Sequence, residues 1–197
     1  EIRSGRKTSH WIWYIWPSLD EVRKTSRPQY SLRSRGDADA FLSDPGLRKN
    51  LYEISEVALS HLLKGTAPGI LFGSRTDVEK FGETVTCFAL VALEARDLEL
   101  SELMVSCLEA LGGDLHAETV KYLLSHAEGL TSLAPSGSTT LDLRCLRDAL
   151  ARLKEEKQAE LLPSGSCDSA PVLRPETAEA AEAAKSVPEE VAASDGA

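Results

Sequence analysis

Residues 76–96, TDVEKFGETVTCFALVALEAR, begin with a helix-capping signal and continue with apolar residues at helical spacing. Thr76 and Glu79 fit a capping box, in which a hydroxyl and a carboxylate three positions apart satisfy free amides of the first turn. The apolar residues recur every three or four positions, which is typical of an α-helix with one buried face. They are Val78, Phe81, Val85, Phe88, Ala89 and Ala92. The stretch predicts a helix that ends at about Arg96.

A second amphipathic segment precedes this helix. Asp44 followed by Pro45 is a strong helix start, because Asp accepts hydrogen bonds from first-turn amides and Pro has no amide to lose. An apolar stripe follows and ends near Gly65, and it consists of Leu47, Leu51, Ile54, Ala58 and Leu62. The interval 65–75, GTAPGILFGSR, is expected to be a turn-rich connector around a short apolar plug.

Three further segments carry the same signals. Ser101 and Asp114 are predicted to cap two helices that are separated by the stop Gly112-Gly113. Thr140 is predicted to open a strongly charged helix that runs through residue 161. No convincing β alternation appears, so the sequence predicts an all-α fold, a single compact domain of antiparallel packed helices.

The composition divides the chain into three parts. Residues 1–130 are predicted to form the main helical domain, and residues 131–162 a loop followed by the charged helix. Residues 163–197 are rich in Ala, Glu, Ser and Pro and hold almost no large apolar side chains. Such a segment buries too little surface to offset the entropy of ordering, so a disordered acidic tail is predicted.

Charge and cysteine content limit the class of protein. The net charge of −9 argues against a nucleic-acid partner, although residues 1–49 carry ten Lys and Arg against six Asp and Glu. No apolar run approaches the roughly 20 residues that span a bilayer, so no membrane partner is predicted. Four dispersed cysteines without a CxxC pair favour a reducing compartment. We therefore expect a cytoplasmic protein, with a nuclear location left open, and neither a metal site nor a cofactor.

All three tryptophans lie in the stretch 6–17, RKTSHWIWYIWP. Thr8 or Ser9 can cap a helix that Pro17 then ends or kinks. One helix face cannot bury so many rings, so some of them are expected to line an interface or a cavity. Aromatic faces beside Arg, Lys and His suit a planar or anionic small ligand.

Four segments carry a family resemblance. The stretch GRKTSHWIWYIWPSL resembles the signature of a domain-of-unknown-function family, DUF 1810, which is often labelled calpastatin-like in bacterial genomes. The segments ADAFLSDPGLRKNL, ILFGSRTDVEKFGETVTCF and CLEALGGDLHAETVKYLL are similar to its later motifs in the same order. The resemblance covers roughly residues 3–128 and implies a helical fold preceded by a further helix, with no established activity. Glu83 and Asp44 depart from the family pattern.

Ten residues are candidates for a ligand-binding site. They are Arg6, Lys7, His10, Trp11, Trp13, Tyr14, Asp77, Lys80, Thr84 and Thr86. The structural alternative is that His10 is a solvated first-turn residue. For Lys80, the alternative is an ordinary surface ion pair with Asp77 or Glu83 at helical spacing.

Three functions remain open at this stage. The first is a protein that binds a small anionic or nucleotide-like ligand, with enzymatic activity left open and general acid–base chemistry at the site if a reaction occurs. The second is a non-catalytic helical module that docks a protein partner through an apolar groove. The third, nucleic-acid binding by the basic N-terminal third, is opposed by the acidic remainder.

Overall fold

A computed structural model describes residues 1–126, 128–131, 133 and 141–161 of the 197-residue chain. Within these residues the secondary structure is helical, which confirms the predicted all-α class, and the β-structure is limited to an isolated bridge between Leu19 and Leu32. The α-helices are α1 (Ile12–Ile15), α2 (Arg35–Ser43), α3 (Pro45–Leu63), α4 (Pro68–Phe72), α5 (Arg75–Glu94), α6 (Leu98–Ala110), α7 (Ala117–His126), α8 (Glu128–Thr131) and α9 (Leu143–Leu161). Short 3₁₀ turns, η1 (Ile2–Ser4) and η2 (Pro28–Tyr30), complete the set.

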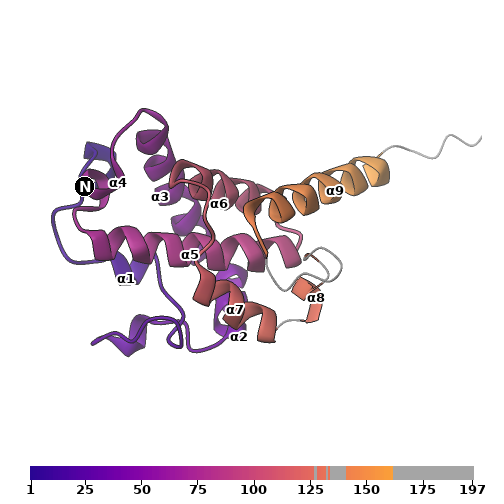
Figure 1. Ribbon diagram of the computed structural model, residues 1–197, viewed down its shortest axis with the longest axis horizontal. Helices are drawn as coiled ribbons and strands as arrows, with labels where there is room; N and C mark the ends of the chain where they lie inside the picture. Colours follow the sequence, from indigo (N-terminus) through magenta and orange to yellow (C-terminus); the bar gives the residue numbers. More distant parts are fainter. Residues whose placement is uncertain (127, 132, 134–140, 162–197) are drawn as a thin grey trace, which may run out of the picture. The chain divides into compact units, whose positions relative to one another are not determined.

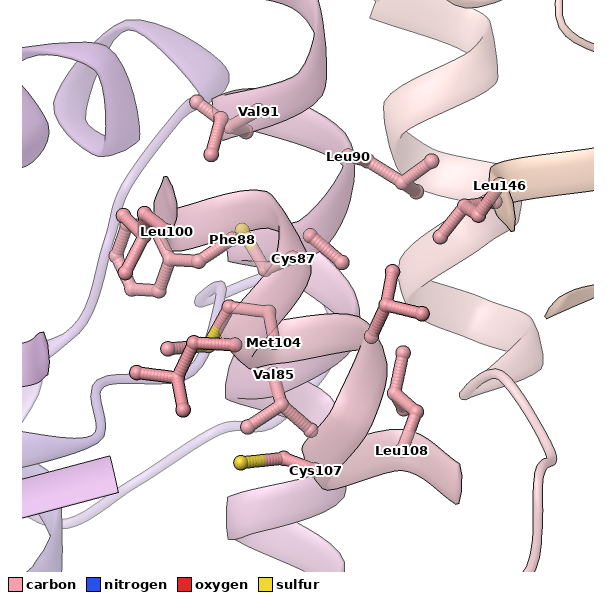
Figure 2. Close-up of a cluster of buried hydrophobic side chains, with 14 of the residues drawn as sticks. Val85, Cys87, Phe88, Leu90, Val91, Leu100, Met104, Cys107, Leu108 and Leu146 are labelled. Carbon is pink, nitrogen blue, oxygen red and sulfur yellow. The ribbon is translucent and has the colours of Figure 1, made fainter. Parts of the chain in front are cut away.

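Helix α5 is the centre of the packing (Figure 1). It contacts α1, α2, α4, α6, α7, α8 and α9, while α6 also packs against α3 and α9. Figure 2 shows the core between α5 and α6, where Phe88 lies beside Leu100 and Val85 lies near Met104 and Cys107, while Leu146 of α9 faces Leu90. These side chains are fully buried. The spacing predicts the helix correctly, but the single buried face is wrong, because every residue from Glu83 to Leu93 is buried and α5 is enclosed on all sides.

Two predicted helix starts are wrong by a few residues. Helix α5 is capped by Ser74, whose hydroxyl accepts the Asp77 amide at 3.1 Å, and Thr76 lies inside the first turn. Helix α6 is capped by Asp97, and Ser101 instead donates to the Asp97 carbonyl. In both segments, several residues with suitable side chains lie close together, and the backbone conformation selects which one becomes the cap.

Of the other predicted helix starts, that of α3 is confirmed and that of α7 is wrong. Asp44 caps α3 as predicted, with 2.8 and 2.9 Å hydrogen bonds from the next two available amides. Helix α7 begins after His116 rather than at Asp114, because the His116 imidazole receives the Thr119 amide. Thr140 lies outside the described residues, and α9 is observed from Leu143.

The aromatic stretch contains a shorter helix than predicted. Helix α1 is a single turn, and neither Thr8 nor Ser9 caps it, because the Thr8 amide and the Ser9 hydroxyl both bond to the Glu1 carboxylate. The turn ends at Trp16, which leaves the helical conformation before Pro17 as expected. The rest of the N-terminal segment up to α2 consists of 3₁₀ turns, bends and irregular loop, and α1 contacts α5.

The predicted division of the chain into three parts stays a prediction. Residues 1–162 form one compact unit, and α9 packs on α5 and α6 within it. A boundary at residue 130 remains a proposal, and the predicted acidic tail, 163–197, lies outside the described residues.

Candidate functional site

Lys80 is a buried cation that faces an indole ring. It lies on α5, its residue is only 7% exposed, and its Nζ is 5.7 Å from the ring centre of Trp13 on α1. The Arg27 guanidinium lies 5.7 Å from the same ring. In the part of the chain that the structure describes, the Lys80 ammonium has neither an ion pair nor a hydrogen bond. The Nζ atom itself is not one of the fully buried atoms that lack a partner, so Lys80 combines a mostly buried side chain with an ammonium that has no direct counter-ion. Partial removal of an unpaired charge from water costs free energy.

The two carboxylates three positions from Lys80 on the same helix are occupied by other cations. Asp77 accepts a 2.6 Å bond from Lys7, and the Glu83 Oε1 atom lies 2.6–2.7 Å from the Arg23 guanidinium. The surface ion pairs considered for Lys80 are therefore not formed, and both Lys80 and Glu83 are buried rather than exposed. The reason is the tertiary structure, because Lys7 and Arg23, which lie 70 and 60 positions away in the chain, pair with these carboxylates.

Three buried polar atoms of α1, the loop that follows it and α5 are unsatisfied within the described residues. Trp13 Nε1, Ser18 Oγ and Glu83 Oε2 are buried and lack a hydrogen-bond partner. Burial lowers the pKa of Lys80 below its usual range, although the charges of Glu83 and Asp77 oppose this effect. Buried polar groups in proteins are almost always paired, so this cluster is unusual.

Lys7 has the same degree of burial in a fully paired setting. It is 6% exposed, and its ammonium lies 5.6 Å from the ring centre of Trp11. Its amide donates to the Leu71 carbonyl at 2.7 Å. Gly73 makes this approach possible: its φ is +82°, and a Cβ there would lie 2.8 Å from the Lys7 carbonyl oxygen. Lys7 and Asp77 thus fasten the N-terminal segment to α4 and α5.

The three tryptophans have different environments, as the excess of rings predicted. Trp16 is fully buried, packs edge-on against Phe72 and Phe81 with ring centres 5.5 and 4.9 Å away, and donates to Ser55 at 3.0 Å. Trp11 instead lines a pocket of about 450 Å³ against α3. Only Trp16 belongs to the closed core.

Trp13 borders a second pocket, of about 250 Å³, which we call the aromatic groove. Its lining includes Trp13, Tyr14, Gln29, Tyr30, Phe41 and Leu47. Tyr14 and Tyr30 form an edge-to-face pair with ring centres 4.6 Å apart, and each is about two-fifths exposed. Trp13 is therefore shared between the aromatic groove and the two cations above its ring.

Of the remaining candidates, Thr84 contacts Lys80 only through the Lys80 backbone carbonyl, and Thr86 bonds to a residue outside this cluster. The Thr84 hydroxyl donates to backbone carbonyl groups. Its oxygen lies 3.0 Å from the carbonyl oxygens of both Pro17 and Lys80. The Thr86 hydroxyl accepts the His116 amide at 3.0 Å. Both threonines are fully buried and hold neighbouring segments in place.

Arg6 and His10 are exposed, and neither side chain has a hydrogen bond or ion pair to a described residue. Whether either residue contacts a ligand stays a prediction. The structure instead adds Arg23, Arg27 and Ser18, which the sequence did not single out. The one available signal was that DEVRKTS, residues 20–26, replaces a Gly-rich turn of the family pattern with charged residues.

The fold and site define a helical domain with a buried lysine beside a tryptophan-lined groove. The family model described as "Protein of unknown function (DUF1810)" matches residues 1–123. The chain belongs to this family, as its motifs indicated. Neither a curated protein nor a solved structure matches the chain.

The described residues also bear on two classes of site, a membrane-spanning helix and a metal centre. None of their helices combines the length and the apolar character needed to cross a membrane. Over the same residues, His, Cys, Asp and Glu side chains form no group of three or more placed to hold a metal ion.

Proposed function

We propose that this domain binds a small anionic ligand at Lys80, Trp13 and Arg27. The observation that carries the proposal is Lys80, a residue only 7% exposed whose ammonium has no ion pair or hydrogen bond among the described residues. An anionic group of a ligand would supply the missing acceptor and remove the cost of the unpaired charge. Arg27 adds a second, exposed cation on the same ring.

The neighbouring ion pairs support this assignment. Lys7 holds Asp77 and Arg23 holds one oxygen of Glu83, so neither carboxylate forms a direct ion pair with Lys80, although both charges favour its protonated form. The indole N–H of Trp13 is a further donor without a partner. Small-molecule sites commonly combine apolar walls with a few convergent polar groups of this kind. We assign no catalytic residue, and enzymatic activity stays open.

The test is a thermal-shift titration of the full chain with inorganic phosphate, sugar phosphates and nucleotides. A ligand that binds only the folded state raises the Tm in proportion to its occupancy. We expect Lys80→Met to weaken binding at least about tenfold, since charge-assisted hydrogen bonds contribute roughly 1.5–3 kcal/mol. The matched control is Lys121→Met, which removes the same charge from an exposed position of α7 and should leave affinity unchanged.

The proposal fails if no anion raises the Tm, or if both lysine variants bind as the wild type does. The second candidate function, a protein interaction module, is favoured by Leu63 and Ile70, which are 73% and 59% exposed at the α3–α4 end. If these residues form a docking surface, Leu63→Lys with Ile70→Lys would change the sedimentation of the protein in solution and leave anion binding unaffected.

A further inference from the structure

We infer that the pocket between the N-terminal segment and α3 binds a small apolar molecule that carries an amine or another cation. The pocket has a volume of about 450 Å³, and we call it the Trp11 pocket. This volume lies within the roughly 300–1,000 Å³ that complete small ligands occupy. Its lining includes neither Lys80 nor Trp13, so the inference is independent of the proposed anion site.

The walls of the Trp11 pocket are apolar. Trp11 and Ile15 come from α1 and its N-terminal cap, and Ile54 and Val57 lie three positions apart on one face of α3. These four side chains are partly buried, whereas Ile2 of η1 is buried. The pocket therefore leaves apolar surface in contact with water, and a ligand that covers this surface gains free energy.

The charged groups in the lining are two carboxylates and one guanidinium. The carboxylates belong to Glu1 and Glu53, and the guanidinium belongs to Arg3. The Glu1 carboxylate accepts hydrogen bonds from the Ser9 hydroxyl and, at 2.7 Å, from Trp11 Nε1, and it forms no ion pair with a described residue. Hydrogen bonds, that of Ser9 above all, hold the pKa of the Glu1 carboxyl below its usual range, so this group stays charged.

Other charges do not cancel these carboxylates. Glu53 forms a 3.4 Å ion pair with Lys49, in which both side chains are exposed, and Arg3 forms no ion pair with a described residue. Lys7 is neutralised by Asp77 and does not belong to the lining. The pocket thus combines apolar walls with an excess of negative charge. A cation on an apolar body complements both features.

The experiment measures the affinity of the full chain for phenylbutylamine, phenylbutanol and phenylbutanoate by isothermal titration calorimetry. The three probes share one apolar body and differ in the charge of the head group. We expect the amine to bind about fivefold more tightly than the alcohol, because an exposed ion pair adds modestly to affinity. The carboxylate should bind most weakly. The preference for the amine should shrink at high salt, which screens exposed charges.

Two variants locate the site. Glu53→Gln should reduce the preference for the amine over the alcohol to about twofold. The matched control is Glu56→Gln, which removes the same charge from an exposed position of α3 outside the lining and should leave the preference unchanged. Val57→Phe should weaken the binding of all three probes at least about tenfold, because the larger side chain fills the pocket. Thermal melting checks that Val57→Phe folds, and the Glu53 comparison decides the inference if it does not.

The inference is refuted if no probe binds, if the alcohol binds as tightly as the amine, or if the carboxylate binds most tightly. It is also refuted if the preference for the amine is the same in Glu53→Gln as in the wild type. Lys80→Met should leave amine binding unchanged, and a loss of binding in this variant would place the amine outside the Trp11 pocket. Failure of this site and failure of the anion site are therefore separate results.

Discussion

Lys7 and Lys80 are similarly buried beside tryptophan rings, but only Lys7 has a counter-ion. Both are more than nine-tenths buried, and each has its ammonium between 5 and 6 Å from the centre of a tryptophan ring. Lys7 is neutralised by Asp77 at 2.6 Å, whereas Lys80 has no counter-ion among the described residues. The first arrangement is closed and holds the N-terminal segment in place. In the proposed function, an anion from a ligand completes the second.

The difference shows that burial alone does not distinguish a structural lysine from a ligand-binding one. The cost of removing an ammonium from water is similar at both positions, and only Lys7 recovers it within the chain. A cation–π contact with an indole contributes roughly 0.5–2 kcal/mol, which is too little to replace an ion pair. The free-energy effects of substitution should therefore have opposite signs at the two lysines.

The largest expected effect is at the paired lysine. Lys7→Met should lower the free energy of unfolding by about 3–5 kcal/mol, because it leaves the mostly buried Asp77 carboxylate without its partner. Urea denaturation measures this loss. Lys7→Met combined with Asp77→Asn should recover part of it, since no buried charge then remains. If Lys7→Met lowers the free energy of unfolding by less than about 1 kcal/mol, the Lys7–Asp77 pair contributes no more than an ordinary surface ion pair. The contrast between the two lysines would then be lost.

The second effect is a gain at the unpaired lysine. Lys80→Met should raise the free energy of unfolding by about 1–3 kcal/mol at neutral pH, since it removes a buried donor without a partner. The pKa of Lys80 is lowered in the folded state, so the unfolded chain binds more protons as the pH rises toward 10.5. Wild-type stability should therefore increase over this range and the advantage of Lys80→Met should shrink.

Denaturation curves of both proteins across neutral and alkaline pH check this prediction. Lys121→Met, at an exposed position, should show no comparable pH-dependent difference from the wild type. If Lys80→Met is less stable than the wild type at neutral pH, the ammonium has a stabilising partner and the comparison with Lys7 fails.

The smallest expected effect comes from a substitution that gives Lys80 a counter-ion within the chain. Arg23→Met releases the Glu83 carboxylate, and Lys80 lies one helical turn before it, within side-chain reach. We expect a loss of only about 1 kcal/mol, because the new pair replaces the old one. Anion affinity should fall about tenfold at the same time, since Glu83 now competes with the ligand. A loss of several kcal/mol with unchanged anion affinity would show that Glu83 does not reach Lys80.

Local sequence determines much of this fold. The Asp44-Pro45 start of α3 and the apolar stripe of α5 depend on capping chemistry and on a 3.6-residue period, and both are read within one or two turns. Where two suitable caps lie close together, as with Ser74 and Thr76, local chemistry is ambiguous and the backbone selects one. The family motifs identified the family for the same local reason.

The roles of the site residues depend on tertiary structure. In the run WIWYIW every face is apolar, so no periodicity separates Trp16 in the core from Trp13 at the groove. The spacing of Asp77, Lys80 and Glu83 is that of a surface ion-pair helix, and the residues that change its meaning lie far away in the chain. Lys7 and Arg23 reach the two carboxylates from 70 and 60 positions upstream and leave Lys80 alone. Two charged groups interact according to their distance in space. Sequence spacing predicts that distance only for residues on the same helix.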